Sequence, residues 1–191
     1  MKYLIPGCLS LALVLSIWSL TSSCNGTNSD TPTQLTDSLL IADIESYREY
    51  VNNTFGRSEN TIYLDASETR QERIVWTETP ADGLIKIVWG ISSDSAVIRQ
   101  TYFLRENQIV YYRDQQWFKF EPSTADQEVH YFNNGKLKKH VRKFMELEPG
   151  KPPVNMVSMQ PMRDKTDYAE KEAKALKRFD EIMKIREENR Q

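Results

Sequence analysis

Histidine is a common metal ligand and proton carrier near neutral pH, and this chain holds two histidines, His130 and His140. They stand on either side of Asn134-Gly135, a dipeptide typical of a two-residue hairpin turn. A regular hairpin closed by that turn places His130 opposite Lys139, which leaves only a diagonal contact with His140. No third ligand stands at a useful spacing. The sequence therefore predicts no metal site and no other cofactor.

Catalytic signatures are missing from the chain. The patterns G-x-S-x-G, Walker A, H-E-x-x-H and G-x-G-x-x-G do not occur. A serine nucleophile would need one of the two histidines as its base, and a carboxylate pair such as Asp65 with Glu78 does not differ from ordinary surface charge. We predict a protein that is not an enzyme and has no catalytic residues. A hydrolase is the least favoured alternative.

Basic side chains alternate along the segment that follows the Asn-Gly turn. The set consists of Lys136, Lys138, His140 and Arg142. Because alternate residues of a strand share one face, they predict a basic stripe that suits an anionic headgroup, a polysaccharide or an acidic patch on a partner. The alternative is a solvated strand whose lysines discourage edge pairing.

The overall charge gives no sign of a nucleic-acid partner. The chain has 25 basic and 27 acidic residues and a net charge of −2. Proteins that bind nucleic acids usually carry a strong basic excess. We predict that this protein has no nucleic-acid partner.

The first 23 residues are typical of a secretory signal. A positive start at Lys2 precedes an apolar run, Leu9 to Leu20, and the small residues Thr21 to Ser23 follow. The run is shorter than the roughly 20 apolar residues that a membrane-spanning helix needs. We predict cleavage before Cys24. Cys8 then leaves with the signal.

The residues that end at Cys24 resemble the lipobox of bacterial lipoprotein precursors. Thr21 replaces the usual aliphatic residue, a relaxation that resembles Bacteroidota-type envelope lipoproteins. The resemblance implies acylation of Cys24 and attachment to the outer membrane through an N-terminal lipid. Because no acidic cluster follows Cys24, the periplasmic face is favoured over the cell surface. Ordinary signal cleavage after Ser23, without lipid, is the alternative.

The mature chain begins with a tether and a helix. Residues 24–35 are small and polar and predict a flexible tether. Thr36 is a suitable N-cap for a helix over 37–54, and Gly56 is a suitable stop. The apolar stripe of this helix consists of Leu40, Ile44, Tyr47, Val51 and Phe55.

From Asn60 to Phe144 apolar and polar residues alternate, as they do in β-strands. Eight short runs are separated by turn residues, including Asp114-Gln115, and no connection is long enough for a crossover helix. Residues 36–147 therefore predict an α+β domain in which a helix precedes an antiparallel meander of about eight strands. The Tyr-rich hairpins at Gln108–Tyr112 and Tyr131–Lys138 resemble hairpins of bacterial envelope lipoproteins.

The last part of the chain changes character twice. Residues 148–163 are rich in proline and predict an extended connector. Residues 164–191 predict a long charged C-terminal helix between Asp167 and Asn189. Its narrow apolar seam consists of Ala169, Ala173, Leu176, Phe179 and Met183, and suits either its own sheet or an envelope protein partner.

Two short patterns, Asp37-Ser38-Leu39 and Asp94-Ser95-Ala96, resemble O-glycosylation sites of Bacteroidota envelope proteins. Ser95 falls in a predicted turn, and Ser38 falls at the predicted start of a helix.

The sequence as a whole predicts a lipid-anchored envelope protein with a non-catalytic binding or scaffolding role. The alternative is a carrier or sensor with an apolar or glycan ligand on the aromatic face of the sheet, which is rich in residues such as Trp76, Trp89 and Trp117.

Overall fold

The computed structural model describes residues 31–56, 58–153, 160–162 and 167–189, with side chains from residue 37 onward. The signal sequence and Cys24 lie outside the described residues. The elements in chain order are α1 (Thr31–Phe55), β1 (Asn60–Ala66), β2 (Arg70–Thr79), β3 (Gly83–Ser93), β4 (Ala96–Arg105), β5 (Gln108–Phe118), β6 (Thr124–Asn133), β7 (Lys136–Glu146) and α2 (Tyr168–Asn189).

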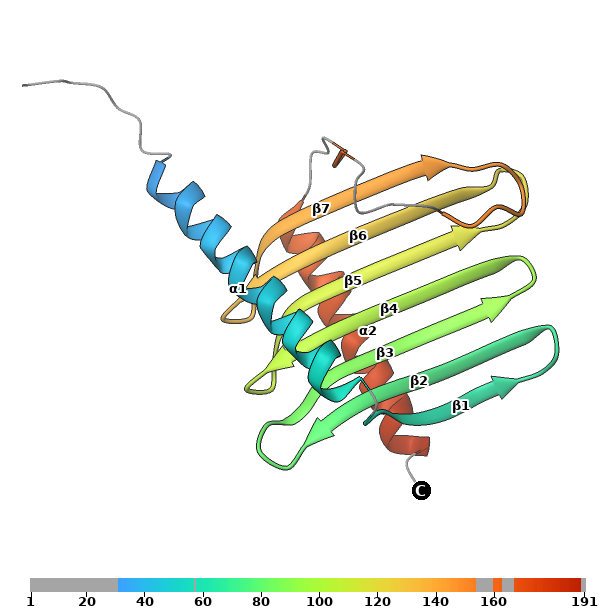
Figure 1. The fold of residues 1–191 in the computed structure, drawn as a ribbon, viewed down its shortest axis with the longest axis horizontal. Helices are drawn as coiled ribbons and strands as arrows, with labels where there is room; N and C mark the ends of the chain where they lie inside the picture. Colours follow the sequence, from blue (N-terminus) through green and yellow to red (C-terminus); the bar gives the residue numbers. More distant parts are fainter. Residues whose placement is uncertain (1–30, 57, 154–159, 163–166, 190–191) are drawn as a thin grey trace, which may run out of the picture.

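The seven described strands form one antiparallel sheet in the order β1 to β7, and every strand pairs with its neighbour in sequence. The two helices cover opposite faces of this sheet (Figure 1). The predicted α+β meander with a helix at each end is confirmed.

Side chains that alternate along the strands supply two separate cores. On one face, Tyr102, Tyr112 and Trp89 belong to a core that includes Ile182 and Ala175 of α2. On the other face, Phe103, Tyr111 and Val129 pack against Ile44 and Val51 of α1. The predicted apolar stripe of the first helix is confirmed, because all five of its members belong to or pack against this second core.

Helix α1 begins earlier than predicted. Its first residue is Thr31, so Thr36 lies inside the helix and the expectation that it is the N-cap is wrong. Residues 31–35 of the predicted tether are helical, and Pro32 is compatible with this because proline is tolerated in the first turn. The predicted stop at Gly56 is confirmed, since a Cβ there would lie 2.5 Å from the Asn52 carbonyl oxygen.

The predicted turn at Asp114-Gln115 is wrong, and this accounts for seven strands where about eight were expected. Both residues lie inside β5, and Asp114 is buried. The amides of Gln100 and Gln116 donate to Asp114 Oδ2 at 3.4 and 3.3 Å. Two neighbouring amides thus bind one oxygen of this carboxylate, which helps a residue typical of turns to lie within a strand, whereas Oδ1 is buried without a hydrogen-bond partner among the described residues.

The hairpin between β6 and β7 has the predicted two-residue turn but not the predicted register. Asn134 and Gly135 have φ angles of 50° and 72°, the left-handed pair that a type I′ turn requires. A β-bulge then follows, because Phe132 pairs with Leu137 whereas Tyr131 pairs with Lys139. The extra residue, Lys138, shifts the register by one, so His130 lies opposite His140. The expected pairing of His130 with Lys139 is wrong.

Helix α2 confirms the predicted C-terminal helix but buries a different stripe. Asp167 Oδ1 accepts hydrogen bonds from the backbone N–H groups of Ala169 and Glu170 at 2.9 and 3.2 Å and caps the helix. Phe179 and Met183 face the sheet as predicted, together with the unpredicted Ala175, Ile182 and Arg186, whereas Ala169, Ala173 and Leu176 are exposed.

Contacts of two α2 arginines with the sheet explain why the buried stripe differs from the predicted one. Arg178 lies 4.2 Å from the ring centre of Trp89, and Arg186 lies 4.9 Å from that of Trp76. These two arginines of α2 pack over tryptophans of the sheet, so the buried stripe of the helix includes charged residues as well as apolar ones.

The connector runs past the edge of β7. Gly150 N donates to Lys119 O just after β5, and Met162 N donates to Arg142 O at 2.8 Å, so Met162 occupies part of the free hydrogen-bonding edge of β7. Residues 154–159 and 163 of the predicted connector lie outside the described residues. Among the helices that are described, none has the length and apolar character needed to cross a bilayer.

Candidate functional site

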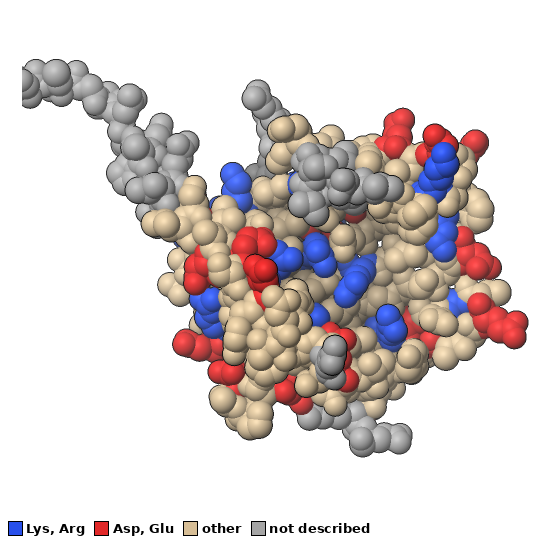
Figure 2. Space-filling view, viewed as in Figure 1, with Lys and Arg blue, Asp and Glu red and all other residues tan. Residues whose placement is uncertain are grey.

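Helix α1 covers only part of its face of the sheet, and the uncovered part of that face carries a hollow of about 350 Å³. Its apolar lining, which we call its floor, includes Val75, Val88 and Val97. Arg73 and Arg99 also line it. We call this site the arginine hollow; Glu59, Gln71, Gly90, Ile91, Ser92 and Ile98 complete its lining. Figure 2 shows Lys and Arg side chains spread over the sheet surface beside α1.

Strand register builds this hollow. Arg73 of β2 pairs with Gly90 of β3, and Gly90 pairs with Arg99 of β4, so the two arginines flank a residue that has no side chain. A Cβ at Gly90 would meet the Ile98 carbonyl oxygen at 3.5 Å, which is an ordinary contact. The backbone does not require glycine here. The missing side chain keeps space open between the two guanidinium groups.

The arginines of this face lack carboxylate partners. Among the residues that the structure describes, Arg73, Arg99 and Arg113 make no ion pair and no hydrogen bond. Burial lowers the pKa of the Arg113 guanidinium, and the positive charges of Arg48 and Arg99 lower it further. Glu59 of the lining is already paired with Lys86 at 2.8 Å. The hollow therefore presents positive charge that no carboxylate of the described residues neutralises.

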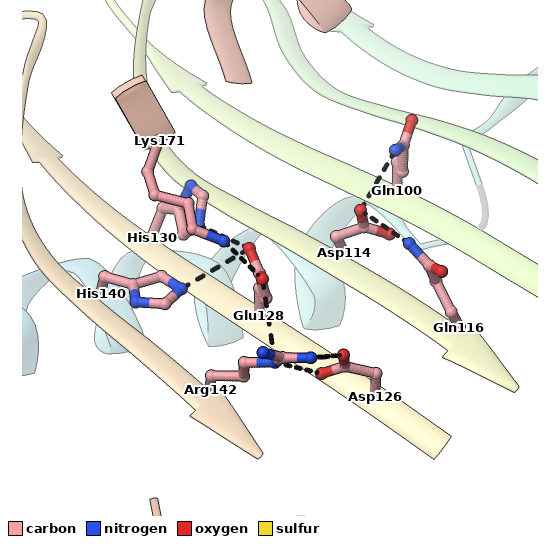
Figure 3. Close-up of polar contacts among 9 residues, drawn as sticks. All are labelled: Gln100, Asp114, Gln116, Asp126, Glu128, His130, His140, Arg142 and Lys171. Atoms are coloured by element: carbon pink, nitrogen blue, oxygen red, sulfur yellow. Dashed lines mark hydrogen bonds and ion pairs between the residues drawn. The ribbon is translucent and has the colours of Figure 1, made fainter. Parts of the chain in front are cut away.

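A second polar group lies on the α2 face, where Glu128, His130 and His140 converge (Figure 3). We call these three residues the His-Glu cluster. Glu128 Oε2 lies 3.5 Å from His130 Nε2 and 3.6 Å from His140 Nε2. The histidine side chains are 1% and 2% exposed. Glu128 and His130 alternate on β6, and the β-bulge brings His140 opposite His130.

Cations and carboxylates surround the His-Glu cluster. Lys171 of α2 contacts Glu128 Oε1 at 2.6 Å, and Arg142 holds Asp126 through contacts of 2.6 and 3.1 Å. The pKa of Glu128 lies well below its usual range because His130, His140 and Lys171 favour its charged form. Burial lowers the pKa of His130 from its ordinary value, and the contact with Glu128 partly offsets this effect.

The predicted basic stripe does not form one exposed face. Lys136 pairs with Glu172 of α2 at 3.0 Å, and Lys138 is exposed at the bulge. His140 and Arg142 instead point to carboxylates of β6, as Figure 3 shows. The bulge interrupts the alternation on which the stripe was predicted. Anion binding by these four residues stays a prediction.

The other predicted sites lie apart from both polar groups. Ser95 is exposed in the β3–β4 turn, with its hydroxyl 3.2 Å from that of Ser93. Ser38 is exposed inside α1, so its expected place at a helix start is wrong. Glycosylation of either residue stays a prediction. Most aromatics of the sheet lie beneath the two helices, and Trp117 is partly exposed.

The sequence analysis did not identify Glu128 or the three arginines of the α1 face, Arg73, Arg99 and Arg113. Glu128-Val129-His130 carries a usable signal, because residues two apart on a strand share a face. The arginines lie on three different strands, so only their register brings them together.

Comparison with protein families, curated proteins and solved structures found no match to this chain.

Proposed function

We propose that this protein is a lipid-anchored cell-envelope protein that binds an amphiphilic anion in the arginine hollow without catalysing a reaction. The observation that carries the binding role is the presence of guanidinium groups without a carboxylate partner in the described part of the chain, next to apolar lining residues.

Arginine chemistry defines the charged part of the ligand. A guanidinium group presents planar donors that match carboxylate and phosphate oxygens. Arg73 and Arg99 approach from two sides of Gly90, and so can share one anionic group between them. Their charges repel each other until an anion arrives, which favours binding.

The floor of the hollow defines the rest of the ligand. Val75, Val88 and Val97 offer apolar surface next to the arginines. The volume of about 350 Å³ is at the lower end of the range for small-molecule sites. A short hydrocarbon tail with an anionic head fits both properties better than a bare inorganic ion.

The anchor rests on the N-terminal sequence. A signal-like segment that ends in small residues before Cys24 supports acylation and attachment to the outer membrane. The periplasmic face remains favoured over the cell surface. An envelope partner on α2 has less support, because the buried stripe of this helix, which includes Ala175 and Ile182, packs on its own sheet.

Calorimetric titration of the full-length protein in nanodiscs of zwitterionic lipid tests the binding role, with hexyl phosphate as the probe. We expect one site per chain, weaker binding of inorganic phosphate, and no binding of the uncharged hexyl glucoside. Arg99→Gln should weaken binding about tenfold or more, because a charge-assisted hydrogen bond contributes roughly 1.5–3 kcal/mol.

Two further variants sharpen this test. Gly90→Val fills the space between the arginines and should also weaken binding, although it changes no charge. Arg70→Gln removes an exposed arginine that already pairs with Glu72, and should leave the affinity unchanged. Equal affinity in the wild type, Arg99→Gln and Gly90→Val would refute the arginine hollow as the binding site. Mass spectrometry that finds an unmodified Cys24 thiol would refute the anchor.

A further inference from the structure

The spacing of the His-Glu cluster matches the coordination sphere of a small metal ion. Zinc binds histidine nitrogen at about 2.0–2.1 Å and carboxylate oxygen at about 2.0–2.2 Å in tetrahedral geometry, which sets neighbouring ligand atoms about 3.4 Å apart. Glu128 Oε2 lies 3.5 and 3.6 Å from the two imidazole Nε2 atoms. The three ligand atoms all lie within 4.8 Å of one another.

Burial of His130 gives an independent indication of a ligand. Its side chain is 1% exposed, its Nδ1 has no hydrogen-bond partner among the described residues, and its Nε2 has only the long contact of 3.5 Å with Glu128 Oε2. Buried polar atoms are almost always satisfied, so a buried imidazole with one nitrogen unpartnered and the other at such a long contact points to a group that occupies this position. The Nε2 atom faces the same Glu128 oxygen that also faces His140.

We propose that Glu128, His130 and His140 bind one divalent transition-metal ion of the zinc class through Glu128 Oε2 and the two imidazoles. Two imidazoles and one carboxylate are a known ligand set for such ions, and they leave a fourth position for water or another ligand. This inference does not depend on the arginine hollow, which lies on the opposite face of the sheet.

The neighbours of the cluster are compatible with a cation. Lys171 contacts the other carboxylate oxygen, Oε1, and so fixes the orientation of Glu128 while Oε2 stays turned to the histidines. Outer-shell contacts of this kind orient ligands in metal sites. Asp126 holds Arg142 in a pair, which limits the positive charge that Arg142 adds near Glu128.

Competition titration with Zn²⁺ alone, against a chromophoric chelator, tests the proposal on the full-length chain. The protein carries no affinity tag, and the background Cys8→Ser/Cys24→Ser removes both thiols. The chain then has no histidine outside the cluster. We expect one Zn²⁺ per chain, and the intense visible absorption of tetrahedral Co²⁺ when Co²⁺ replaces it.

Variants of each ligand identify the site. Glu128→Gln, His130→Gln and His140→Gln should each weaken Zn²⁺ binding more than about 100-fold, since even outer-shell changes commonly cost 10- to 100-fold. Glu146→Gln, which removes an exposed carboxylate at the end of β7, should leave the affinity unchanged. Circular dichroism identifies the variants that fold, and only those are compared.

Two results would overturn the proposal. One is a folded parent protein that binds no Zn²⁺ or Co²⁺. The other is a folded ligand variant that binds Zn²⁺ as tightly as the parent. Added Zn²⁺ should also raise the midpoint of thermal unfolding of the parent but not of His140→Gln, because a ligand that binds the folded state stabilises it.

Discussion

On the α2 face, the cations that reach the sheet meet carboxylates, whereas on the α1 face three arginines meet none among the described residues. Lys171 contacts Glu128, Arg142 contacts Asp126, and Arg186 contacts Glu78. Arg73, Arg99 and Arg113 have no such partner within the described residues. Helix α2 crosses the far face of the sheet from β7, near Lys136, to β2, near Glu78 (Figure 1).

This difference separates charges that hold the fold together from charges that remain for a ligand. An ion pair between helix and sheet is complete within the chain and fixes their relative position. A cluster of like charges costs free energy in the folded state and is retained more easily where binding offsets that cost. The α1 face is therefore our candidate for recognition, and the α2 face combines packing with the His-Glu cluster.

The largest expected effect concerns the apolar side of α2. Ile182→Ala should lower the free energy of unfolding by about 2–5 kcal/mol, because Ile182 is fully buried against the sheet. Leu176→Ala, the matched control on the exposed side, should change it by less than about 0.5 kcal/mol. Urea unfolding measures both values. Similar losses in the two variants would show that α2 is rotated from the position described.

A smaller effect contrasts one arginine from each face. Arg142→Met should lower the free energy of unfolding by about 1 kcal/mol, because Asp126 loses its partner in a partly exposed site. Arg113→Met should be neutral or stabilising, since it removes a partly buried cation near Arg48 and Arg99.

Salt sharpens the contrast between these two arginines. Added salt screens repulsion between nearby cations, so it should narrow the difference between Arg113→Met and the wild type. Urea unfolding at low and high salt measures this. Equal destabilisation by both substitutions would remove the distinction between the two faces.

The smallest effect is a pH dependence at the junction of α2 with β7. Glu172 accepts a hydrogen bond from Leu137 N and pairs with Lys136, and both hold its pKa below the usual 4.5. The folded protein therefore gains stability from the charged form at pH values above 4.5 and loses it as the pH falls through the lower folded pKa. Glu172→Gln should be less stable than the wild type at neutral pH. Thermal unfolding should show this difference disappearing in acid, and a difference that is independent of pH would contradict the assignment.

Local patterns predicted most of the fold. Two confirmed predictions depend only on residues close in sequence. They are the turn at Asn134-Gly135 and the helical spacing of apolar residues such as Ile44 and Val51. The errors arose where tertiary contacts decide the outcome. Asp114 resembles a turn residue until Gln100 and Gln116 are seen beside it, and Arg186 resembles a solvent residue until Trp76 is seen beneath it.

The candidate sites were harder to predict because they depend on register. One extra residue, Lys138, decides whether His130 faces Lys139 or His140, and bulges have no firm sequence signature. The arginine hollow requires three strands to be aligned at once, with Gly90 between Arg73 and Arg99. Alternation along a single strand cannot supply that alignment.

The strict pairing of each strand with its successor has a consequence for the order of folding. Contacts between sequence neighbours cost little loop-closure entropy, so the hairpins can form one after another from β1 as the chain emerges. Helix α2 arrives last and returns across nearly the whole sheet. Until it docks, Ile74, Tyr102 and Phe132 have no cover on their face. A chain that ends before Tyr168 should therefore expose a broad apolar surface and aggregate rather than persist as a smaller folded domain.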